Sequence, residues 1–167
     1  MYQGSGSGVK WNHNSILGFT DDETVMLDFD DTKFRKVKYW AQVAMKHFGL
    51  GGFLILKSSE NHYHVVFNRK VDWAENMSIV AWVSLQSNNQ NMLRYLRMQC
   101  IKKASTLRVG PKGEKMTPRI VYREGLEDGQ IAGFIAHRNL IKRIMNKHTL
   151  ETPRAYDGKE LLFIKKD

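Results

Sequence analysis

Cysteine is almost absent from this 167-residue chain, since Cys100 is the single one. One cysteine cannot build a disulfide framework within the chain, and it rules out a cysteine zinc site. No apolar stretch reaches the roughly 18 residues of a membrane span, and the N-terminus lacks a signal-peptide core. These absences predict a cytoplasmic protein with no membrane partner, which folds around an ordinary hydrophobic core.

Acidic residues are also in the minority. The chain has 17 Asp and Glu against 26 Lys and Arg, and its net charge is +9. A basic balance of this size favours a polyanionic partner, nucleic acid first. The acids concentrate between positions 21 and 31, whereas the bases concentrate in 94–123 and 137–148. An acidic site on a basic body suits metal-assisted chemistry on phosphates.

Hydrophobic periodicity predicts an α+β domain. Its sheet is mainly antiparallel, and helices pack against it. Residues 1–10 are rich in glycine and serine and are predicted to be flexible, so the single domain should cover 11–167. No internal repeat is present. Strands are expected at 25–29, 53–57, 62–68, 105–109, 119–122 and 160–164, and helices at 32–48, 72–85, 91–103 and about 129–147.

Two aspartates in the first expected strand are the main clue to function. Asp28 and Asp30 alternate with apolar residues, so both side chains point to one face of the strand. Two carboxylates on one face form half a site for a hard divalent cation. Acids at the N-terminus of a helix are an alternative explanation, which suits Asp31 better than Asp28. A buried carboxylate without compensation is costly, which favours the metal site.

Two histidines follow in the same pattern. His62 and His64 share one face of the returning strand of a hairpin, after the polar turn 58–61. If the β-α-β connection stays within one sheet, this strand lies near the aspartates. The histidines would then bind a phosphate or complete a metal site. In the alternative interpretation, the segment is only a hairpin turn with polar side chains.

Basic side chains are expected close to this site. Arg108 and Lys112 lie on a later strand and its exit loop, where arginine suits bidentate phosphate contact and lysine a point charge. A solvated basic loop is the alternative. Further basic residues form either a general phosphate-binding surface or solvated helix faces: Arg94, Arg97, Lys102, Lys103, Lys115, Arg138, Lys142, Arg143 and Lys147.

Residues 24–68 resemble the archaeo-eukaryotic primase superfamily. The strand 27–30 is similar to its motif I, in which two aspartates alternate with hydrophobic residues. The six-residue spacing from Ser58 to His64, followed by an apolar strand, is similar to motif II. The resemblance implies an RRM-like sheet and a DNA primase or polymerase that acts in replication. Its partners would be single-stranded DNA or a primer–template, nucleoside triphosphates and a possible replication protein.

The same resemblance implies roles for individual residues. Asp28 and Asp30 would hold the catalytic Mg²⁺ or Mn²⁺ ions, with His64 completing the catalytic set. The incoming nucleotide would be bound by Ser58, Ser59, His64, Arg108 and Lys112. Two metal ions would stabilise the in-line displacement of pyrophosphate.

The chain departs from this family pattern at two places. The strand at 105–109 lacks the third carboxylate that the family supplies, and Glu114, Asp72 and Asp128 are substitutes that no spacing argument separates. Ser59 replaces a glycine of the motif II turn. A relative that binds nucleic acid without catalysis is therefore an alternative.

A second resemblance gives a rival function. The segment His62-Tyr-His64 also resembles the His-hydrophobic-His motif of rolling-circle replication initiators, which cut DNA with a tyrosine on a later helix. Tyr95 would be that nucleophile. The lysine usual four residues later is Gln99 here, and this function leaves the two aspartates of the first strand without a clear role.

Overall fold

The computed structural model describes residues 15–112, 114–125, 131, 132, 134–136, 138, 139 and 161–165. The predicted flexible segment 1–10, Asp128, Lys142, Arg143 and Lys147 lie outside the described residues. The elements are, in chain order, β1 (Ser15–Asp21), β2 (Thr24–Phe29), α1 (Phe34–Phe48), β3 (Phe53–Ser59), β4 (His62–Lys70), α2 (Trp73–Gln86), α3 (Gln90–Lys102), β5 (Ser105–Arg108), β6 (Arg119–Glu124) and β7 (Leu161–Lys165).

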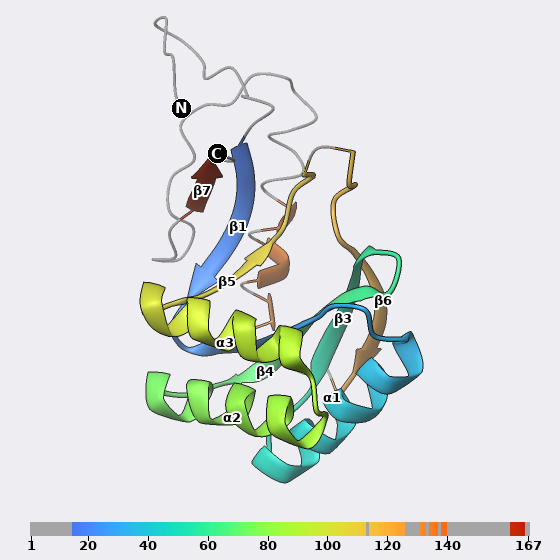
Figure 1. Cartoon of the computed structure of the whole chain (residues 1–167), viewed down its shortest axis with the longest axis vertical. Coiled ribbons are helices and arrows are strands. Elements are labelled where there is room, and N and C mark those ends of the chain that lie inside the picture. The colour runs from blue at the N-terminus through green and yellow to red at the C-terminus, as the bar shows by residue number, and fades with distance from the viewer. Residues whose placement is uncertain are drawn as a thin grey trace, which may run out of the picture.

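These elements form an α+β fold, as the periodicity predicted (Figure 1). The strands make two antiparallel sheets rather than one, in the orders β2-β4-β3-β6 and β5-β1-β7. Strand β1 was not predicted. It pairs with both β5 and β7, so the second sheet depends on it.

The segment from β2 to β4 positions the site. Strands β2 and β3 are each antiparallel to β4, which lies between them, so the β2-α1-β3 connection is a split β-α-β unit. The helix between them begins at Phe34, two residues later than expected. Its N-cap, Lys33, makes no side-chain hydrogen bond because an ammonium group cannot accept one, and the Thr32 hydroxyl donates to the Asp30 carbonyl. Gly49 ends the helix in the left-handed conformation, which glycine adopts without steric cost.

Helix α1 covers one face of this four-stranded sheet. Phe34 lies against Tyr63 of β4 and Tyr122 of β6, with ring centroids 5.8 and 6.2 Å apart. Tyr63 alternates with His62 and His64 along β4, so the two histidines point to the opposite face. The core beneath the helix is apolar, and the polar groups of the site lie on the other side of the sheet.

Helices α2 and α3 and the second sheet complete the described structure. The Asn76 amide of α2 donates to the Thr24 carbonyl of β2, and the Gln99 side chain of α3 accepts from the Thr106 N–H of β5. Residues 131, 132, 134–136, 138 and 139 are helical, in agreement with the last predicted helix. Phe134 of this helix packs edge-to-face against Phe19 of β1 at 5.1 Å. Within the described part of the chain, no helix has the length and apolar character to cross a membrane.

Candidate functional site

The two strands that carry the predicted site residues are direct neighbours. Strand β2 pairs with β4, and the register places Asp28 opposite His64. Asp28 Oδ1 lies 3.6 Å from His64 Nε2. Two residues further on, Asp30 Oδ1 lies 2.5 Å from His62 Nδ1, within hydrogen-bond distance. The structure therefore brings both aspartates and both histidines to one sheet face as two cross-strand pairs.

Burial changes the protonation of the inner pair. Burial, together with the smaller effect of the Asp30 charge, raises the pKa of Asp28 from 3.8 to about 7. The Asp28 side chain keeps 30% of its surface exposed, so the cause is close packing around the carboxyl rather than isolation from water. Burial also lowers the pKa of His64 to about 3, and the charge of Arg108 adds to this effect. His64 is therefore neutral at pH 7, and its contact with Asp28 is not an ion pair.

The outer pair is more open to solvent. The Asp30 side chain is 44% exposed and that of His62 28% exposed. His62 also has its second nitrogen 3.8 Å from Asp31 Oδ1. Asp31 is in the left-handed conformation, with φ of 48°, and its side chain is 82% exposed. This backbone kink turns the chain out of β2 and into α1, so Asp30 lies at the mouth of the site.

Arg108 is held rigidly at the edge of the site. Its guanidinium donates to the carbonyls of Gly110 at 2.5 Å, Met116 at 2.8 Å and Ser58 at 3.1 Å. These bonds tie β5 and the following loop to the β3–β4 turn. The positive charge also lowers the pKa of Asp28. Arg108 is thus placed near the carboxylates as predicted, but much of its donor capacity is already committed to main-chain carbonyls.

The other predicted phosphate ligands lie in two parts of the structure, the β3–β4 turn and the loop after β5. The Ser58 hydroxyl donates to the His62 carbonyl at 3.3 Å, and Ser59 pairs with His62 across the turn. Lys112 forms a tight antiparallel bridge with Lys115 in the loop after β5. Lys115, which the sequence marked only as part of a general basic surface, has a charge that acts on Asp28. The path of the loop after β5 places Lys115 toward the site, and no spacing in the sequence indicated this position.

The substitutes for the third carboxylate are not assembled with the aspartates. Asp72 is the N-cap of α2, where its side chain accepts from the Glu75 N–H at 2.8 Å. Glu114 lies in the exposed loop between Lys112 and Lys115. Neither has a described contact with Asp28 or Asp30.

Tyr95 lies behind the inner pair rather than at the surface. Its side chain is 9% exposed, burial raises its pKa well above 10, and the charge of Asp28 raises it further. The Ser105 hydroxyl is close enough to oppose this rise, yet neither hydroxyl makes a hydrogen bond of normal geometry. A buried phenol that resists ionisation is poorly suited to attack DNA.

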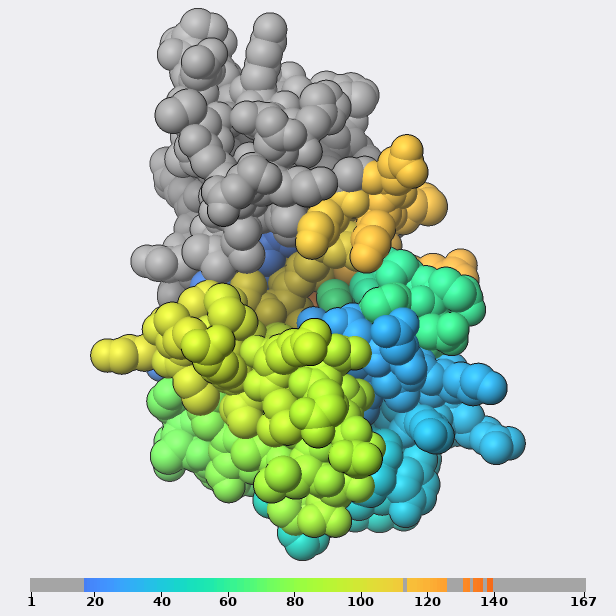
Figure 2. Space-filling model, in the orientation of Figure 1, coloured from blue at the N-terminus to red at the C-terminus, as the bar shows by residue number. Residues whose placement is uncertain are grey.

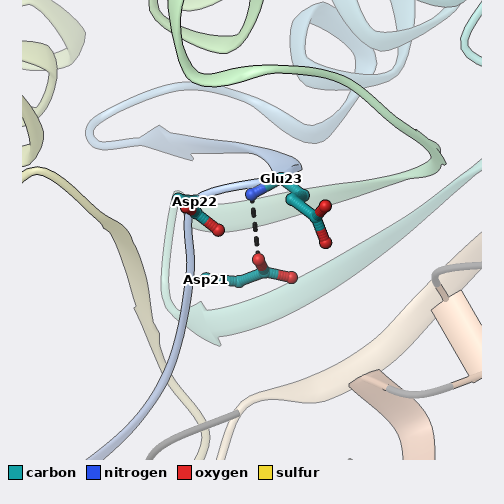
Figure 3. Close-up of side chains that lie close together, drawn as sticks. All are labelled: Asp21, Asp22 and Glu23. Atoms are coloured by element: carbon teal, nitrogen blue, oxygen red, sulfur yellow. Dashed lines mark hydrogen bonds between the residues drawn. The ribbon is translucent and has the colours of Figure 1, made fainter. Parts of the chain in front are cut away.

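A second acidic cluster lies in the turn between β1 and β2 (Figure 3). Asp21, Asp22 and Glu23 are the one group among the described residues that brings three ligand atoms within 4.8 Å of one another. The Asp21 carboxylate already accepts from the Glu23 N–H at 2.9 Å and from the Thr24 hydroxyl at 2.5 Å. Glu23 also pairs with Lys70 at 3.0 Å. These bonds account for the cluster as a turn-stabilising motif.

The donor chemistry of the β2–β4 face fits a hard divalent cation. Asp28 and Asp30 offer carboxylate oxygens on one face, and His64 offers a neutral imidazole. The two carboxylates with either histidine do not bring three ligand atoms within 4.8 Å, so binding requires the Asp30–His62 pair to rearrange.

Comparison with known proteins returns no relative for this chain. No family model matches it, and neither a curated protein nor a solved structure does. The functional argument therefore rests on the geometry of the β2–β4 face.

Proposed function

We propose that this protein is a primase-like nucleotidyltransferase that extends or starts a DNA strand with nucleoside triphosphates. The observation that carries the proposal is the cross-strand arrangement of Asp28 and Asp30 against His64 and His62, with the charge of Arg108 beside them. The resemblance of residues 24–68 to the archaeo-eukaryotic primase superfamily supports the same function.

Asp28 and Asp30 would hold Mg²⁺ or Mn²⁺. Bound cations of this kind neutralise charge on a triphosphate and lower the cost of forming the alkoxide that attacks it. The raised pKa of Asp28 means that the free site stores a proton near pH 7, which a cation must displace. The hydrogen bond from His62 orients Asp30 while the site is free.

His64 and the β3–β4 turn would bind the nucleotide phosphates. A neutral imidazole donates one hydrogen bond without the repulsion that a charged histidine would add to the cations. Arg108 keeps the turn in place through the Ser58 carbonyl, so its role combines positioning with a fixed positive charge. Lys115 adds a positive charge from the loop after β5.

The rival function as a DNA-nicking initiator has weaker support. It needs both histidines on one face, which the structure has, and an accessible tyrosine, which the buried Tyr95 is not. A relative that binds nucleic acid without catalysis is the other alternative, because neither Asp72 nor Glu114 joins the two aspartates.

Primer extension with Mn²⁺ and labelled triphosphates tests the proposal. Asp28→Asn and His64→Ala should each abolish extension, whereas Tyr95→Phe should retain it. Asp22→Asn, which removes an exposed acid in the β1–β2 turn, is the matched control and should extend normally. A covalent protein–DNA band that disappears in Tyr95→Phe would overturn the proposal in favour of the nicking function.

A further inference from the structure

A pocket of about 500 Å³ lies at the end of β2, on the α1 side of the four-stranded sheet. Its walls are residues 29–33 at the end of β2, the α1 side chains Lys36 and Trp40, and the α2–α3 connection at 87–91. Figure 2 shows the start of α1, in blue, between the β3–β4 turn and the α2–α3 connection. Asp30 and Asp31 line the pocket and also belong to the site described above, so the two share these residues at the end of β2.

The cations of the pocket are free to bind an anion. Lys33 and Lys36 are one helical turn apart on α1, both exposed, and neither makes an ion pair with any described residue. Exposed lysines without an ion-pair partner on the wall of a pocket are suited to contact a phosphate backbone. The size of the pocket is in the range that holds one nucleotide-sized group.

The opposite wall is rich in amides. The side chains of Asn88, Gln90 and Asn91 have no hydrogen bond within the described part of the chain, whereas Asn89 is fixed as the N-cap of α3. Asn89 also donates to the Thr32 hydroxyl at 3.4 Å, which ties the connection to the end of β2. The 87–91 wall is therefore fixed before any ligand binds, and its free amides can donate hydrogen bonds to nucleobase edges and accept hydrogen bonds from them.

An aromatic side chain completes the pocket. Trp40 is half-buried, follows Lys33 and Lys36 along the same side of α1, and lines the inner wall. Positive charge next to an aromatic surface and free amides is the combination by which proteins bind single-stranded nucleic acid.

We propose that this pocket binds one nucleotide of a single-stranded nucleic acid. Lys33 and Lys36 contact the phosphate backbone of the strand, and the 87–91 connection contacts the nucleobase. The inference extends the proposed function, since it places the template strand beside the site that would copy it. A strand is favoured over a free triphosphate because Lys33 and Lys36 are two separate exposed charges on the pocket wall.

The test measures binding of a labelled oligothymidylate by fluorescence anisotropy, in chelator and without triphosphate. Because no metal or nucleotide is present, failure of the proposed catalysis does not affect the result. The double change Lys33→Ala with Lys36→Ala should weaken binding and make the slope of log K against log salt shallower by about 1.4, at 0.7 for each single-strand phosphate contact. Arg35→Ala with Lys46→Ala removes the same charge from exposed sites on the same helix outside the pocket, and should have a smaller effect.

A second variant separates pocket binding from general charge. Asn91→Asp places a negative charge in the pocket, within the first turn of α3, where an acid favours the helix. It should weaken oligonucleotide binding about tenfold, because the carboxylate loses the amide's hydrogen-bond donors to the nucleobase and repels the phosphates, while thermal stability is kept. Ser78→Asp, an equal charge change on the exposed side of α2, is its control.

Two outcomes would overturn the inference. In one, Asn91→Asp and the lysine pair bind the oligonucleotide as the parent does. In the other, these variants weaken binding of a free triphosphate but not of the oligonucleotide, which would assign the pocket to the nucleotide instead. If primer extension still depends on Asp28, either outcome would overturn this inference and leave the proposed function unaffected.

Discussion

Two acidic segments lie close together in this chain, and the structure uses them differently. In the β1–β2 turn, Asp21, Asp22 and Glu23 are consecutive, and the turn's own N–H and hydroxyl groups satisfy the Asp21 carboxylate. At the end of β2, Asp28 and Asp30 alternate with apolar residues, and each lies against a histidine of the next strand. Consecutive acids can bond to their own turn. Alternating acids share a strand face, which leaves them available to a ligand.

The largest effect should come from removing the alternating pair. Asp28→Asn with Asp30→Asn should weaken Mn²⁺ binding by more than about a hundredfold, beyond the loss usual for residues that only support a metal ligand. Titration calorimetry measures this directly. The control is Asp22→Asn with Glu23→Gln, which removes the same charge from the turn and should bind Mn²⁺ as the parent does. Loss of Mn²⁺ binding only in the turn variant would assign the metal to the turn, and equal loss in both would show that general charge, not this site, sets the affinity.

Arg108 joins the site to the rest of the structure, and its removal should be the next largest effect. Arg108→Ala breaks three hydrogen bonds to main-chain carbonyls, so unfolding should become easier by about 2–4 kcal/mol. Chemical denaturation measures this. Arg108→Lys should not restore stability, because an ammonium cannot reach all three carbonyls as a planar guanidinium does. Full rescue by lysine would show that charge alone matters.

The pH dependence of stability should distinguish the inner pair from the turn. The folded state binds a proton at Asp28 between about pH 4 and pH 7 that the unfolded state has lost, so this group lowers stability as pH rises through that range. Asp28→Asn should therefore stabilise the metal-free protein at pH 8, by roughly 1–3 kcal/mol. Asp22→Asn should change stability by less than about 0.5 kcal/mol at either pH.

His64 should produce the opposite dependence. The pKa of His64 is lowered in the folded state. The unfolded state therefore binds a proton below about pH 6.5, whereas the folded state binds it only below about pH 3. Stability consequently falls as pH falls through that range. Between pH 4 and 6.5 the two groups offset each other. Asp28→Asn should expose the acid sensitivity due to His64, and His64→Gln should remove it. Thermal unfolding across pH 4–8 measures both slopes, and parallel curves for the two variants would contradict the assignment.

The smallest effect should come from the turn itself. Asp21→Asn keeps an acceptor for the Glu23 N–H but loses the charged acceptor of the Thr24 hydroxyl, so unfolding should become easier by about 1–2 kcal/mol. Mn²⁺ binding should not change. A loss of metal affinity in this variant would show that the turn is more than a structural motif.

Much of the local structure was predictable from the sequence. The α+β class, the strand that carries Asp28, and the hairpin that carries His62 and His64 follow from periodicity and turn chemistry, and they are confirmed. Strand β1 was missed because residues 15–21 do not alternate between apolar and polar, and its partners lie far along the chain in β5 and β7. The RRM-like label stays a prediction.

The sequence by itself determined which side chains can meet on a strand face, because the strand period of two is local. Tertiary structure decided which strand faces that strand, and hence that Asp28 opposes His64 and that burial raises the pKa of Asp28. It also committed Arg108 to three carbonyls, buried Tyr95, and joined Lys33 to the 87–91 connection across a pocket. These outcomes depend on contacts between residues far apart in the chain, and burial and Coulomb interactions follow distance in space rather than in sequence.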